Sequence, residues 1–103
     1  MTIYHIVTPA VWDNFKDKEF YEATSLQAEG FIHCSFAEQV DAVLNRYYTD
    51  AEKILLLAVE TEKLTSELIN EPSTGGEIYP HIYGRINREA IVGIEERNLQ
   101  NAR

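Results

Sequence analysis

The chain has 103 residues, 45% hydrophobic and 25% charged, which is typical of one compact soluble domain over residues 1–103. A single cysteine excludes an internal disulfide, and no apolar run reaches the ~20 residues that a membrane-spanning helix needs. The formal net charge of −8 argues against a bulk nucleic-acid partner but not against a small nucleotide ligand. Because the first residues also lack a secretory signal pattern, we expect a cytoplasmic protein with no membrane partner.

Periodicity and turn residues then divide the chain into elements. The patterns predict a strand at 2–7, a helix at 9–16, a short strand at 20–21, an irregular turn at 25–28, a strand at 31–34, a helix at 36–48, and strands at 54–59, 64–69, 78–83 and 90–94. Residues 54–59 are apolar on both faces and are expected to form a central strand. Pro80 indicates an edge position or the start of a strand, and residues 98–103 a frayed tail.

Both predicted helices begin directly after a strand. Thr8 and Pro9 suit the cap and first position of one helix, and Ser35 with Glu38 has the spacing of a capping box for the other. Both helices lie in the first half of the chain, followed by consecutive strands. The order therefore predicts an α+β fold rather than a doubly wound parallel sheet.

Three histidines are the most informative residues for function. His5, His33 and His81 each lie in an apolar, strand-like run. Imidazole is suited to proton transfer, metal ligation or polar contact near neutral pH. One shared polar site and three separately satisfied histidines both fit this pattern.

The histidines could also ligate a metal, and Cys34 and Ser35 beside His33 could act as nucleophiles. Zinc would accept three imidazoles and a water, but the separations of 28 and 48 residues contain no short metal-binding motif. Cys34 follows His33 directly and points to the opposite face of a strand, so a buried structural cysteine is favoured. Ser35 shares the strand face of His33, yet no nucleophile elbow surrounds it.

Anion binding is a further alternative. The two helix starts after His5 and His33 could face one ligand, because helix N-termini favour negative charge. Arg85 and Arg88 follow the third histidine and could hold a small anion such as phosphate. No glycine-rich phosphate loop is present, and two ordinary capped helices explain the same pattern.

Taken in order, four segments resemble domain-of-unknown-function family 952. They are Tyr4-His5-Ile6-Val7 with Trp12, Gly30-Phe31-Ile32-His33-Cys34-Ser35, Ile54-Leu55-Leu56-Leu57 and Pro80-His81-Ile82-Tyr83-Gly84. The likeness runs through almost the whole chain. In that family proline often follows the triplet that corresponds to Ile82-Tyr83-Gly84, whereas this chain has Arg85 there.

The family is similar to a reduced ADP-ribosyltransferase fold, which implies split, mainly antiparallel sheets around a cleft for NAD or an ADP-ribose-like nucleotide. The resemblance implies cofactor-binding roles for His5, Ser35, Tyr83 and Arg85, and catalytic roles for His33 and His81. His33 would position the ribose and His81 would be the acid or base. Sites of that fold carry one polar residue on each of three core strands, and the third is often a catalytic glutamate. No glutamate lies in the Pro80–Gly84 segment around His81.

Three functional hypotheses follow. The first is a nucleotide-binding protein with ADP-ribosyl or phosphoryl transferase activity. The second is a non-catalytic nucleotide-binding module with the same cleft. The third is a metal-dependent hydrolase that uses the three histidines.

Overall fold

The strands pair into three separate antiparallel sheets rather than one continuous sheet. The computed structural model describes residues 1–99. Its elements are β1 (Thr2–Val7), α1 (Pro9–Asp13), β2 (Phe20–Tyr21), α2 (Thr24–Glu29), β3 (Ile32–His33), α3 (Val40–Tyr47), β4 (Lys53–Glu60), β5 (Glu67–Pro72), β6 (Ile78–Tyr83), β7 (Ile86–Asn87) and β8 (Ile91–Asn98). The sheet orders are β1-β4-β8, β2-β7 and β3-β6-β5. The expected α+β fold with split, mainly antiparallel sheets is confirmed at this level.

The strand β4 lies at the centre of the first sheet, as its two apolar faces predict. Ile54, Leu57 and Val59 are completely buried. Leu57 and Val59 belong to the larger core cluster, which includes Trp12 and Ile82, whereas Ile54 packs in a smaller cluster with α3. The two clusters use side chains from both faces of β4, which explains why its apolar run is continuous.

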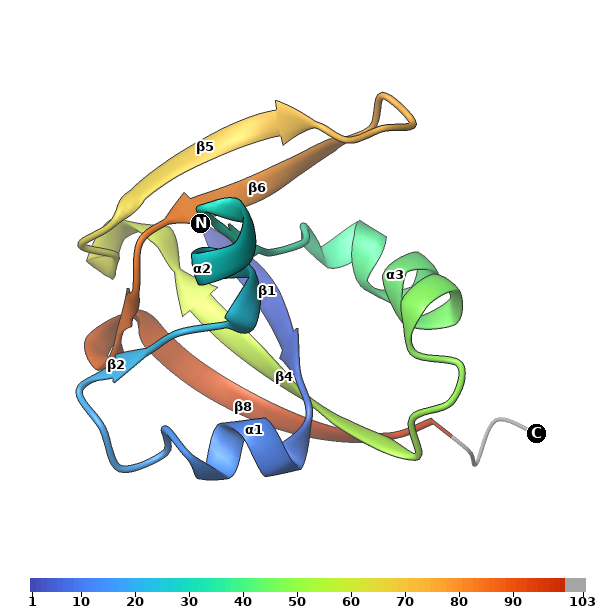
Figure 1. The fold of residues 1–103 in the computed structure, drawn as a ribbon, viewed down its shortest axis with the longest axis horizontal. Helices are drawn as coiled ribbons and strands as arrows, with labels where there is room; N and C mark the ends of the chain where they lie inside the picture. The colour runs from blue at the N-terminus through green and yellow to red at the C-terminus, as the bar shows by residue number, and fades with distance from the viewer. Residues whose placement is uncertain (100–103) are drawn as a thin grey trace.

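A backbone bridge joins the first sheet to the segment that carries the second histidine. The N–H of Tyr4 donates to the carbonyl of Ser35 at 2.8 Å, and the N–H of Ser35 donates to the carbonyl of Tyr4 at 2.7 Å. In Figure 1 the β5–β6 hairpin lies on one side of the molecule and β4 with β8 on the other, with β1 and α2 between them. The bridge therefore fixes β1 beside β3, where two sheets meet.

Two N-terminal predictions are wrong in detail. The predicted turn at 25–28 lies within helix α2, which ends where Gly30 adopts φ +92° and its N–H donates to Leu26. A left-handed residue after a helix is a common stop signal, and glycine adopts it without strain. The predicted helix at 9–16 stops at Asp13 and continues as turns.

The predicted capping box is also wrong. Ser35 is committed to its bridge with Tyr4, and the helical segment begins after Phe36, with a single 3-10 turn before α3. The backbone N–H of Phe36 donates to Gln39 Oε1 at 2.9 Å. The Nε2 of buried Gln39 donates to the carbonyl of Ile78 at 2.7 Å, which ties the helix start to β6. A local sequence pattern could not reveal this long-range amide contact.

Differences in the second half concern strand boundaries. The strand predicted at 64–69 is displaced to Glu67–Pro72, β7 was not predicted, and β8 extends to Asn98. Pro80 lies in the middle strand of its sheet rather than at an edge. It is accommodated because β3 is only two residues long and the Pro80 carbonyl still accepts the N–H of Cys34. The predicted tail falls partly at 100–103, outside the described residues.

Among the described residues, no helix has the length and apolar character needed to cross a bilayer.

Candidate functional site

His33 connects the other two histidines. The strand β3 pairs with β6 so that His33 lies opposite His81, and their ring centroids are 5.4 Å apart. On the other side, Nδ1 of His5 lies 2.7 Å from the carbonyl oxygen of His33. The structure therefore brings all three predicted histidines into one cluster.

His5 is buried and held at both ring nitrogens. The carbonyl of His33 can only accept a hydrogen bond, so Nδ1 of His5 carries the proton. Its Nε2 must then accept from the Tyr21 hydroxyl, 2.7 Å away. Burial lowers the pKa of His5 from its ordinary 6.5 to about 4. His5 is thus a neutral organising residue at physiological pH, and its protons are committed.

A pocket of about 280 Å³ opens beside this hydrogen-bonded chain. Its wall combines aromatic, imidazole and hydroxyl groups with short apolar side chains. The lining includes Tyr4, His5, Tyr21, His33, Ser35 and Tyr48. Neither lysine nor arginine lines it among the described residues. We call this feature the His5 pocket; it unites His5, His33 and Ser35.

His81 lies just outside that lining, in a second polar arrangement. Its Nδ1 is 2.7 Å from Glu71 Oε1, and the Tyr83 hydroxyl donates to the same oxygen at 2.5 Å. The Phe31 ring stacks on His81 with centroids 4.1 Å apart and planes 18° apart. Hydrogen bonds from Tyr83 and His81 lower the pKa of the Glu71 carboxyl, which therefore stays ionised near neutral pH.

Sequence reasoning missed Glu71 because the residue fell within a predicted loop. It actually ends strand β5, which pairs along the whole of β6. The alternation of β5 beyond its predicted end was the available signal, since Ile69 and Glu71 share one face. Glu71 supplies the carboxylate that the segment around His81 lacks.

A second glutamate accompanies His33. Nε2 of His33, in strand β3, lies 3.1 Å from Oε2 of Glu29, the last residue of α2. The His33 side chain is 55% exposed, in contrast to His81 at 10%. Each of the two neighbouring imidazoles therefore has one ring nitrogen beside a carboxylate.

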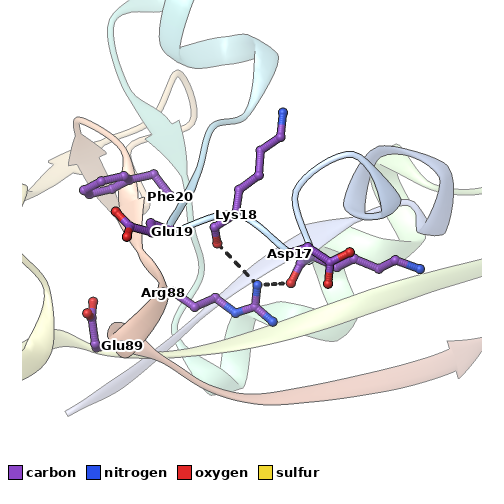
Figure 2. A pocket seen from close by; sticks show the side chains of 7 residues that line it. Asp17, Lys18, Glu19, Phe20, Arg88 and Glu89 are labelled. Atoms are coloured by element: carbon purple, nitrogen blue, oxygen red, sulfur yellow. Dashed lines mark hydrogen bonds between the residues drawn. The ribbon is translucent and has the colours of Figure 1, made fainter.

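The predicted arginines lie elsewhere. The Arg85 guanidinium stacks on the Phe20 ring at 4.0 Å and does not line the pocket. Arg88 Nη1 donates to the backbone carbonyls of Lys16 and Lys18, and all three residues line a separate pocket of about 380 Å³ (Figure 2). The two arginines are consequently not assembled with the histidines into an anion site.

The remaining candidates are Cys34 and a metal. Cys34 is fully buried, and burial raises the pKa of its thiol, as expected of a structural cysteine. Within residues 1–99, no three histidine, cysteine, aspartate or glutamate side chains converge as metal ligands would. The three imidazoles are close, but each is hydrogen-bonded to different partners: His5 to the His33 carbonyl and Tyr21, His33 to Glu29 and His81 to Glu71.

The fold and this cluster define a small α+β protein with split antiparallel sheets and a histidine-lined pocket. Residues 6–94 match the model of a family described as protein of unknown function (DUF952), so the chain belongs to that family. No curated protein matches the chain.

Solved structures of the Caulobacter crescentus protein CC0527 have the same fold. Its crystal structure is 32% identical to this chain, with a TM-score of 0.81, and the match covers 95% of this chain and 85% of that one. Its solution NMR structure is 33% identical, with a TM-score of 0.76, 95% coverage of this chain and 84% of that one.

Proposed function

We propose that this protein binds a nucleotide by enclosing its nucleoside part in the His5 pocket. The observation that carries the proposal is the lining: His5, His33 and Ser35 meet aromatic side chains around one cavity. Pockets for small ligands combine apolar and aromatic walls with a few polar groups that fix orientation. Aromatic rings provide contact area for a base, and hydroxyl and imidazole groups suit ribose hydroxyls.

The volume and the charge of the pocket limit which part of a nucleotide it could hold. The pocket of about 280 Å³ lies at the lower limit of the ~300–1,000 Å³ typical of ligand pockets, which suits a base with its sugar better than a whole dinucleotide. The lining carries no permanent positive charge among the described residues. Phosphates of NAD or ADP-ribose would therefore lie outside the pocket, towards the exposed face of His33.

The resemblance to ADP-ribosyltransferases supports NAD or an ADP-ribose-like nucleotide as the ligand. In this proposal His33 and His81 are the catalytic residues, and Tyr83 holds Glu71 beside His81. A contact between Arg85 and a phosphate requires its guanidinium to leave the Phe20 ring. Transfer activity would release nicotinamide from NAD, whereas a binding module would leave NAD intact.

Thermal unfolding with separate additions of adenosine, AMP, ADP-ribose, NAD and zinc tests the proposal. A ligand that binds the folded chain raises the free energy of unfolding by mass action, by about 2.7 kcal/mol at a concentration of 100 times Kd, and Tm rises with it. We expect nucleotides to raise Tm and His33→Ala and Tyr48→Phe to reduce that increase. Tyr47→Phe, at an exposed tyrosine outside the pocket, is the matched control. No stabilisation by any nucleotide, or stabilisation by zinc alone, would overturn it.

A further inference from the structure

Two imidazole–carboxylate pairs lie next to each other in the histidine cluster. Glu71 pairs with His81 and Glu29 pairs with His33, and the two rings are 5.4 Å apart in a T-shaped arrangement. Neither carboxylate was identified from the sequence. A neutral histidine has one donor and one acceptor nitrogen, and His33 and His81 each have only one ring nitrogen partnered within the described residues. The two remaining nitrogens lie on adjacent rings, which suggests a joint chemical role.

His81 is arranged as a base. The ionised Glu71 fixes the proton of His81 on Nδ1, which leaves the lone pair of Nε2 available, and Nε2 has no hydrogen-bond partner among the described residues. Tyr83 holds the Glu71 oxygen from a second direction, and the stacked Phe31 fixes the plane of the His81 ring. The orientation of the free nitrogen is therefore determined by three contacts.

His33 is arranged as an acid. Its Nε2 is beside Glu29, and its Nδ1 is free of partners among the described residues. The His33 side chain is 55% exposed, so solvent reaches its ring. A protonated His33 would hold one proton towards Glu29 and offer the other, on Nδ1, to a ligand.

We propose that His81 and His33 act as base and acid on a phosphoester of the bound nucleoside, with Glu71 and Glu29 as positioning residues; this rests on the proposed nucleotide site. An alkoxide leaving group needs a proton as its bond to phosphorus breaks. Nicotinamide leaves NAD as a neutral pyridine and needs none, so a second imidazole would be idle there. The paired geometry therefore favours a phosphoester over the nicotinamide bond.

With water as the nucleophile, the proposed reaction is hydrolysis of the phosphoester. His81 Nε2 takes a proton from water as the water oxygen forms a bond to phosphorus. The bond from phosphorus to the ester oxygen breaks, its electron pair stays on that oxygen, and protonated His33 delivers the proton. Exchange with solvent then returns His81 to its neutral form and His33 to its protonated form.

The test compares two substrates with different leaving groups. The full chain is assayed on 2′,3′-cyclic AMP, whose leaving group is an alkoxide, and on a p-nitrophenyl ester of a nucleoside monophosphate, whose leaving group needs no acid. We expect His81→Gln to lower both rates by at least ~100-fold and His33→Gln to lower only the first. Glu71→Gln should lower both rates, while Glu67→Gln, on the same strand, should leave both unchanged.

A ¹⁵N spectrum gives a reading that needs no substrate. We expect a proton on Nδ1 of His81 in the native chain and a mixture of tautomers in Glu71→Leu. Retained Tm increase with AMP but no ester hydrolysis would overturn the acid–base inference and leave the binding proposal standing. Loss of the AMP response would instead overturn the binding proposal. A proton on Nε2 of native His81, or equal effects of His33→Gln on both esters, would also overturn the inference.

Discussion

The Nδ1–H of His5 donates to the backbone carbonyl of His33 at 2.7 Å, so these two histidines are coupled through the main chain rather than ring to ring. The short strand β3 has only two residues, and this side-chain contact supplements its pairing with β6. The buried histidine therefore holds the exposed histidine in place. Their contributions to stability should differ sharply.

Replacing His5 by alanine should destabilise the fold by about 2–4 kcal/mol. The change leaves the Tyr21 hydroxyl and the His33 carbonyl without their buried partner, and each unsatisfied group costs ~1–3 kcal/mol. His33→Ala, at a largely exposed side chain, should cost less than about 1 kcal/mol. Urea unfolding of both variants measures the difference, and equal losses would contradict the structural role of His5.

Acidification should destabilise the fold through His5. Its pKa is about 4 in the folded chain and 6.5 in the unfolded chain, so between these values only the unfolded state is protonated. The stability contribution is complete above about pH 6.5, falls as the pH is lowered through this window and totals about 3 kcal/mol. Urea unfolding at a series of pH values measures the slope.

The control for this slope is His5→Gln, which removes the titrating ring. The lowered pKa of Glu71 also makes stability fall with acid, but only below the ordinary carboxyl value of 4.5. Between about pH 5 and pH 6.5 the variant should therefore have a flatter profile than the native chain. An unchanged slope in this interval would mean that His5 is solvated in the folded chain.

Sequence patterns predicted the elements that depend on local periodicity. The apolar run at 54–59 identified the central strand because burial on both faces leaves no polar alternation. Helix α2 was missed because its six residues have no buried side chain, so it has no apolar stripe to recognise. The start of α3 was misplaced because Gln39 is held by strand β6, far away in sequence.

The residues of the candidate site also fall into those that sequence patterns identified and those that they missed. The three histidines were recognisable because a polar ring in an apolar strand is unusual, and the structure places them together. Glu71 was not, because its role depends on the register that pairs β5 with β6. Arg85 seemed close to His81 in sequence, but the glycine before it turns the chain towards Phe20. Proximity along the chain was a poor guide wherever a turn intervened.

Gly84 should resist substitution because of Ser66. A Cβ at position 84 would lie 2.8 Å from the Cβ of Ser66, whose hydroxyl donates to the carbonyl of Arg85 at 2.6 Å. We expect Gly84→Ala to cost about 1–3 kcal/mol, since the Ser66 side chain cannot move away from the new methyl group without breaking its hydrogen bond to Arg85. Adding Ser66→Gly should recover part of the loss in urea unfolding. No coupling between the two changes would show that Gly84 is required for another reason.

Arg88 should stabilise the loop between α1 and β2. Its guanidinium donates to the carbonyls of Lys16 and Lys18 and lies 5.3 Å from the centroid of Trp12, so one side chain closes the loop onto α1 (Figure 2). Arg88→Ala should cost about 1–2 kcal/mol, the sum of modest hydrogen-bond and cation–π contributions.

Amide hydrogen exchange distinguishes a local from a global effect of this change. We expect faster exchange at Lys18, whose N–H donates to Phe15 within the loop, and little change in β4 at a temperature well below Tm. Arg46→Ala, at an exposed arginine beside Tyr47, is the control and should leave exchange in the loop unaltered. Equal acceleration in the loop for both variants would rule out the closure by Arg88, because Arg88 donates to loop carbonyls and Arg46 lies beside Tyr47 instead.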